Sequence, residues 1–395
     1  MSAPTASKYF ADRCTDFLPV EELDERIRYA RSLEYTLRKW ELKPEFRLRA
    51  EQVAAILTVP LPYLQPGGRL SEDGILFLRI NLDSITPLCK YCKREPGHPW
   101  QPPAVSQAAS STQYGGSGLD DCSGSLYEPP SDTDTSSSSM IVKDYDMDMA
   151  EQKRCLNRDG NACVLTGSTK PSAYHIAPFS WNNTQANIKK TRKIGGARSL
   201  IAGFGFMSRT SYLCDPESPG ASDEAWNMIS MDPQLYSLWC RGYFALRYLN
   251  MDPIGQHEMN ITLEFRWMPQ MKEYFGQEID TYNTGSGYNI QDLIDELYGF
   301  HDYGDPAPIA DYETKLGTPT NNRPTLWSGK RIYIRMQMED AYRFKDMIDM
   351  QWSCIIITAL SGATGSPQLL ANKDSKDRVM HWVQDHARIR RRAMK

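Results

Sequence analysis

Two basic segments are the first features of the sequence whose residue types suggest a chemistry. One reads IKKTRKIGGAR and places basic side chains at Lys189, Lys190, Arg192, Lys193 and Arg198. Such side chains contact nucleic-acid phosphates, and these contacts weaken as salt rises. We predict a phosphate-contacting arm here, with a solvated loop as the alternative. The other segment is compatible with a nuclear localisation signal, a nucleic-acid contact or a charged tail, and consists of Arg388, Arg390, Arg391, Arg392 and Lys395.

The cysteines bear on metal binding and on the compartment of the protein. Two of the nine cysteines precede a histidine in the pattern Cys89-x2-Cys92-x5-His98. A structural zinc site usually needs four ligands in two pairs, and no second pair follows, so we predict no zinc here. An odd number of scattered cysteines fits reduced thiols better than a disulfide framework. We therefore predict an intracellular protein, either cytoplasmic or nuclear.

Three short motifs follow one another between residues 158 and 246. They read DGNACVLTG at 159–167, YHIAPFSW at 174–181 and WNMISMDPQLYSLWCRGYFAL at 226–246. In this order they resemble the HNH endonuclease domain, and most closely the HNH-domain proteins that are widespread in fungi. The resemblance covers about residues 152–269 and, more weakly, residues 350–365.

This resemblance implies two short strands and a helix that surround one divalent metal ion, either Mg, Mn or Zn. His175 matches the general base of the family, and Asn227 matches the asparagine that positions this base or its backbone. An imidazole with a pKa of about 6.5 can deprotonate water near neutral pH. A cation on the scissile phosphate would stabilise the developing charge. The implied function is metal-dependent hydrolysis of phosphodiester bonds in DNA or RNA.

Three positions depart from the family pattern, and all three are positions of metal ligands. Tyr174 stands before His175, where many members have an acidic residue or a histidine. Tyr236 stands where members have a histidine, and Cys240 where they often have aspartate or histidine. A phenol with a pKa of about 10 is a poor ligand at neutral pH, and a thiolate favours zinc over magnesium. The alternative to a nuclease is therefore a degenerate HNH module that binds nucleic acid or protein.

The helix expected at 233–241 carries two of these departures. Asp232 can cap its first turn, and Pro233 suits the first helical position because no hydrogen bond is lost there. Tyr236 and Cys240 are four residues apart and share one helix face, which we expect to look towards His175. The carboxylates nearest to these positions, which could replace the missing ligands, are Asp223, Glu224 and Asp232. We expect them to be solvated charges or helix caps instead.

Hydrophobic periodicity predicts the elements around these motifs. Apolar residues at helical spacing predict helices at 17–51, 51–57, 340–359 and 375–394. Alternating or short apolar runs predict strands at 75–80, 161–167, 173–177, 243–249, 261–267 and 332–338. Helices and strands are therefore mixed, and the expected fold class is α+β.

Composition sets the remaining limits. The 395 residues include 45 Lys and Arg against 49 Asp and Glu, which excludes a globally basic nucleic-acid binder but not a local basic patch. A hydrophobic fraction of 41% is enough for a sizeable core. No apolar run reaches the roughly 18 residues of a membrane span, so we expect no membrane partner. No pattern indicates an oligomeric state.

A change of composition at 97–139 divides the chain. This stretch is rich in Ser, Pro, Gly and Asp and poor in aliphatic residues, so it cannot offset the entropy of ordering. We predict a mainly helical region at 1–96, a disordered linker at 97–139 and a larger domain at 140–395. In the larger domain an HNH (ββα-metal) module, with its core at 152–269, is embedded in further strands and helices.

Overall fold

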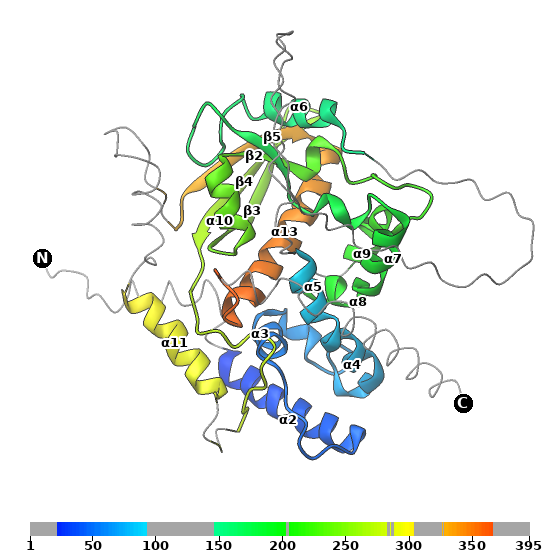
Figure 1. The fold of residues 1–395 in the computed structure, drawn as a ribbon, viewed down its shortest axis with the longest axis vertical. Helices are drawn as coiled ribbons and strands as arrows, with labels where there is room; N and C mark the ends of the chain where they lie inside the picture. The colour runs from blue at the N-terminus through cyan, green and yellow to red at the C-terminus, as the bar shows by residue number, and fades with distance from the viewer. Residues whose placement is uncertain are drawn as a thin grey trace, which may run out of the picture. The chain divides into compact units, whose positions relative to one another are not determined.

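The computed structural model describes residues 22–92, 146–202, 205–282, 285, 288–303, 326 and 328–365. The linker predicted at 97–139, the helix predicted at 375–394 and the basic segment at 388–395 lie outside these ranges. Helices alternate with two small antiparallel sheets, so the chain belongs to the α+β class (Figure 1). Within the described ranges, no helix combines the length and the apolar character needed to cross a membrane.

The first described segment, 22–92, folds into helices. These are α2 (Leu23–Glu41), α3 (Ala50–Thr58), α4 (Ile75–Asp83) and α5 (Ile85–Cys92), with the short 3-10 helices η2 (Leu61–Tyr63) and η3 (Glu72–Gly74). Helix α2 ends at Glu41 because Leu42 adopts a left-handed conformation with φ 53°. The strand predicted at 75–80 is wrong, since this run opens α4, in which Leu78 and Leu82 are buried one turn apart. Short apolar runs fit a buried helix as well as a strand.

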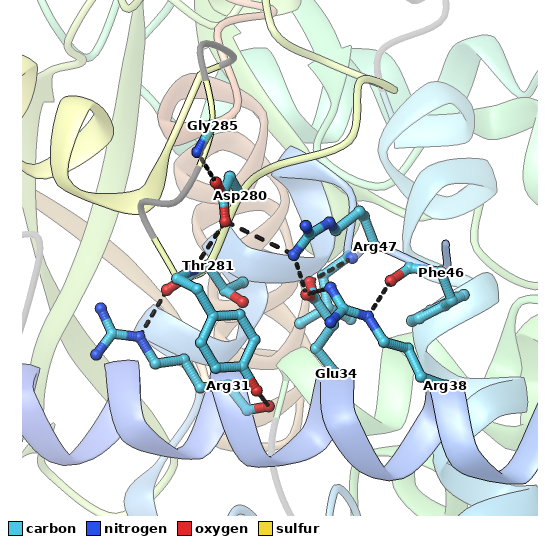
Figure 2. Close-up of polar contacts among 10 residues, drawn as sticks. Arg31, Glu34, Arg38, Phe46, Arg47, Asp280, Thr281 and Gly285 are labelled. Carbon is cyan, nitrogen blue, oxygen red and sulfur yellow. Dashed lines mark hydrogen bonds and ion pairs between the residues drawn. The ribbon is translucent and has the colours of Figure 1, made fainter. Parts of the chain in front are cut away.

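A buried carboxylate ties α2 to the segment that precedes α3. Glu34 is fully buried and accepts hydrogen bonds from the backbone N–H of Leu48 (3.0 Å) and from Arg47 (3.0 Å). It also pairs with Arg38 one turn further along the helix. Arg47 lies 3.6 Å from Asp280, and Figure 2 shows further bonds between α2 and this later segment. Polar contacts to residues 280–282 therefore join the helical region predicted at 1–96 to a later part of the chain.

The strands form two separate sheets. Strands β1 (Ser172–His175) and β2 (Met228–Met231) pair antiparallel. The second sheet has the order β3-β4-β5 and consists of β3 (Phe244–Ile254), β4 (Glu258–Trp267) and β5 (Arg331–Gln337), all antiparallel. The strands predicted at 173–177, 243–249, 261–267 and 332–338 are confirmed, with bounds that differ by a few residues.

The strand predicted at 161–167 is wrong. The backbone is left-handed at Gly160, Asn161 and Gly167, and extended strands do not accommodate that conformation. The segment is a turn, and its Val164 N–H donates to the carbonyl of Ser230 in β2 (3.0 Å). The motif therefore packs beside the small sheet as a turn, not as one of its strands.

Helix α13 (Met338–Leu360) joins the described parts into one core, and it confirms the helix predicted at 340–359. It packs against β3 on one side and against α3 and α5 on another (Figure 1). A single cluster of buried residues includes Leu33 of α2, Phe265 of β4 and Phe344 of α13. Residues before and after the boundary predicted near residue 97 therefore belong to one core, and the boundary does not separate two cores.

The chain between β1 and β2 is mainly helical. It forms η4 (Phe179–Trp181), α7 (Gln185–Lys193), α8 (Gly195–Ile201), α9 (Phe206–Arg209), η5 (Ser211–Cys214) and η6 (Ala225–Asn227). Helix α6 (Met149–Arg158) precedes β1 and packs on both strands of the small sheet. The other helices in the described ranges are α10 (Pro233–Cys240) and α11 (Ile290–Tyr303).

Candidate functional site

Strands β1 and β2 followed by α10 give the order strand, strand, helix. The register places His175 opposite Met228 and Tyr174 opposite Ile229. Strand β2 runs directly into α10, where the carboxylate of Asp232 accepts from the N–H of Gln234 (2.9 Å). The predicted cap and the proline at the first helical position are both confirmed. Because only Asp232 separates β2 from α10, the helix begins next to the small sheet.

The three positions at which the sequence departs from the HNH pattern lie together. The rings of Tyr174 and Tyr236 stack with their centroids 3.7 Å apart and their planes 9° apart. The thiol of Cys240, one turn further along α10, lies close enough to Tyr236 to raise the pKa of its hydroxyl. Residues from one strand and one helix therefore converge, and the space between them is filled by two aromatic rings and a thiol.

The chemistry of the two phenols does not fit a divalent cation. Burial raises the pKa of Tyr236 well above its usual value, and the neighbouring Cys240 raises it further. Burial likewise raises the pKa of Tyr174. Both phenols are therefore protonated at neutral pH, whereas metal ligands act in their deprotonated form. Within the described ranges, no group of three or more His, Cys, Asp or Glu side chains is arranged to hold a metal ion.

His175 lies on the other face of β1 from Tyr174, because successive side chains in a strand point to opposite faces. Its Nε2 is 2.7 Å from the Oδ1 of Asp223, whose side chain is buried. Its ring also contacts Phe179, with centroids 5.5 Å apart. The expectation that the Tyr236 face of α10 looks towards His175 is therefore wrong, since that face stacks on Tyr174.

Asn227 positions backbone, which is one of the two roles that the resemblance implies. Its side chain is fully buried. Its Oδ1 accepts from the N–H of Ala177 (2.9 Å), and its Nδ2 donates to the carbonyls of Ala177 (3.1 Å) and Ser222 (2.9 Å). Ala177 lies two residues after His175, and Ser222 directly precedes Asp223. The amide therefore fixes the distance between the two segments that carry the His175–Asp223 pair.

The first part of the basic segment is helix α7, where the sequence suggested an arm or a loop. The hydroxyl of Thr184 caps the helix by accepting from the N–H of Asn187 (3.1 Å). Ile188 and Thr191 are buried, and the hydroxyl of Thr191 donates to the carbonyl of Trp181. The outward face carries four exposed cations, which are Lys189, Lys190, Arg192 and Lys193.

Arg198 is a correction to the predicted set of phosphate contacts. Its side chain is fully buried in α8, so it cannot reach a phosphate on the surface. Its Nη2 donates to the Sγ of Cys214 (2.9 Å), and its guanidinium lies over the ring of Trp181 at 5.6 Å. Burial lowers the pKa of Arg198, and the thiol of Cys214 acts in the opposite direction. Arg198 therefore belongs to the interior.

Asp223 is the residue of the candidate site whose role the sequence did not suggest. We expected a solvated charge, but its carboxylate is buried, pairs with His175 and also accepts from the backbone N–H of Asp148. His175 and Asp223 are 48 residues apart, and no local pattern connects them. One sequence signal could have suggested a role at the site, because Asp223 stands only four residues before Asn227.

Comparison of the chain with protein-family models, with curated proteins and with solved structures finds no match.

Proposed function

We propose that the chain contains an HNH-derived ββα module that binds nucleic acid inside the cell without hydrolysing it. The observation that carries the proposal is that the side chains at positions 174, 236 and 240 lie next to one another. Tyr236 and Cys240 are one turn apart in α10, so the contact that supports the alignment with the HNH pattern is the stacking of Tyr174 from β1 on Tyr236. The stacked phenols and the thiol that occupy them support the loss of the metal ion.

Helix α7 supports nucleic acid as the ligand. Its four exposed cations occupy positions i, i+1, i+3 and i+4, so they cover the outward half of the helix. The helix is anchored through Thr191 to Trp181, and Trp181 belongs to η4 together with Phe179, which contacts His175. The cations therefore extend from a fixed support next to the ββα module, and DNA or RNA phosphates fit them.

Replacing the four α7 cations, Lys189, Lys190, Arg192 and Lys193, with alanine is expected to weaken nucleic-acid binding at least about tenfold near 0.1 M salt. It should also reduce the slope of log affinity against log salt by up to about 3 to 4, because each phosphate contact contributes about 0.9 on duplex DNA. Fluorescence anisotropy with labelled duplex DNA and single-stranded RNA across a salt titration measures both quantities.

A matched control removes the same charge elsewhere, by alanine at the exposed residues Arg28, Lys39, Lys43 and Lys153. This variant should bind with nearly the salt slope of the parent. Equal losses in both variants would show that net charge, and not α7, determines binding. Unchanged binding in the α7 variant would reject nucleic acid as the ligand of this helix and leave a protein partner to be sought.

A second candidate function, hydrolysis, is supported by the His175–Asp223 pair. A carboxylate that hydrogen-bonds one ring nitrogen orients an imidazole and favours its action as a base. If the parent nicks plasmid DNA or cleaves RNA with Mg, Mn or Zn, His175→Ala should lower that rate about 10²- to 10⁴-fold. We expect no cleavage by the parent, and cleavage that depends on His175 would overturn the non-catalytic proposal.

A further inference from the structure

Two buried cysteines from distant parts of the sequence lie side by side. The Sγ of Cys92 in α5 is 2.7 Å from the Sγ of Cys354 in α13, and the residues are 262 positions apart in the chain. This distance is shorter than the van der Waals contact distance of two sulfur atoms. It approaches the S–S bond length of a disulfide, which is about 2.05 Å. The packing of α5 on α13 creates the approach, so neither helix has to move far for the sulfurs to bond.

The surroundings of the pair favour reaction of one thiol before the other. Cys92 lies at the last residue of α5 and is 6% exposed, whereas Cys354 is fully buried. The guanidinium of Arg198 is near enough to Cys92 for the two to interact electrostatically. Among the described residues Arg198 has no carboxylate partner, and its Nε and Nη1 make no hydrogen bond. Cys92 is therefore the thiol of the pair that a small oxidant reaches first.

We propose that Cys92 and Cys354 form a reversible disulfide when the protein meets hydrogen peroxide. The thiolate of Cys92 attacks one peroxide oxygen, the O–O bond breaks, and hydroxide leaves and takes a proton to become water. Cys92 is now a sulfenic acid. The sulfur of Cys354 then attacks this sulfur, an S–S bond forms, and the S–O bond breaks. The second hydroxide takes the Cys354 proton, so two thiols are oxidised, one peroxide is reduced and two waters form.

The disulfide would hold the last turn of α5 on the central helix of the core. Helix ends fray, and Cys92 is the last residue of α5. A cross-link between residues so distant in sequence strongly restricts the unfolded chain, so oxidation should stabilise the fold. We expect the Tm to rise by roughly 5 °C or more on oxidation and to return when a dithiol reductant is added.

The experiment treats the reduced full-length chain with hydrogen peroxide, blocks the remaining thiols with an alkylating reagent and maps the peptides by mass spectrometry. The expected product is a monomer that has lost two hydrogens and contains a Cys92–Cys354 linked peptide. Cys92→Ala and Cys354→Ala should each abolish that peptide and the rise in Tm. Cys89→Ala is the matched control, because Cys89 is also buried in α5 one turn earlier, and it should leave both unchanged.

Several results would overturn the proposal. In one, Cys92 and Cys354 are both still free thiols that the reagent alkylates, although the peroxide has oxidised other cysteines in the chain. Another is linkage of Cys92 to Cys214, the thiol that lies against Arg198, in place of Cys354. A third is a disulfide between two chains, visible as a dimer on a non-reducing gel. Should an alanine variant fold poorly, the peptide map of the parent alone still decides whether this bond forms.

Discussion

Replacing Asn227 with alanine is expected to lower the free energy of unfolding by about 2–4 kcal/mol. The side-chain amide satisfies three buried backbone groups, which are the N–H and the carbonyl of Ala177 and the carbonyl of Ser222. A buried polar group that loses its partner costs about 1–3 kcal/mol, and water that enters the new space recovers part of this. Urea unfolding followed by circular dichroism measures the change, with an unaltered m-value expected.

Two further variants make the Asn227 result specific. Asn227→Asp keeps the shape but cannot donate to the two carbonyls, so it should also be destabilised, by an amount comparable to that of alanine. Asn187→Ala removes a half-buried side-chain amide that donates to the Oδ1 of Asn183 (2.8 Å), and it should change the free energy of unfolding by less than about 0.5 kcal/mol. Parent-like stability of Asn227→Ala would show that the amide does not hold the two segments together.

The features that the sequence predicted are those with local causes. Helix α10 followed from Asp232 and Pro233, whose effects act within one turn. Strand β4 followed from the alternation of apolar and polar residues along it. Strand β2 was not predicted, because its four residues MISM are all buried and show no alternation. The same ambiguity made the opening of α4 look like a strand, and only packing in three dimensions distinguishes the two.

The features that could not be predicted depend on contacts between distant residues. The pairing of His175 with Asp223 crosses 48 residues of mainly helical chain, and no periodicity of the sequence connects the two residues. Arg198 belonged to a basic segment by sequence, yet it points inward because α8 is buried on nearly every side. The stacking of Tyr174 on Tyr236 depends on how α10 folds back on β1. The resemblance to the HNH pattern identified these two positions, but not what fills the space between them.

Placing metal ligands at the three converging positions is expected to create a metal site. The variant combines Tyr174→His, Tyr236→His and Cys240→Asp. Two imidazoles and a carboxylate are a donor set that zinc and manganese accept, and the backbone already brings these positions together. Calorimetry should show zinc binding about 100-fold or more tighter than in the parent, which corresponds to about 2.8 kcal/mol.

The same variant should link metal binding to stability. Loss of the stacked tyrosines destabilises the apo form, and zinc at 100 times its Kd should restore about 2.7 kcal/mol because it binds the folded state. Binding should weaken as the pH falls below about 6.5, since protons then compete for the imidazoles. The control is Tyr174→Phe with Tyr236→Phe and Cys240→Ala, which keeps the rings, removes the donors and should bind no metal.

The outcome separates the alignment with HNH domains from the interpretation of this chain as degenerate. A triple variant that folds but binds zinc no better than the control would reject the alignment, because positions 174, 236 and 240 would then not be ligand positions. Stoichiometric zinc in the purified parent would instead make Cys240 a ligand and contradict the loss of the metal. Gain of the site together with cleavage that requires His175 would show that the His175–Asp223 pair still supports catalysis, and that the missing ligands alone keep the parent inactive.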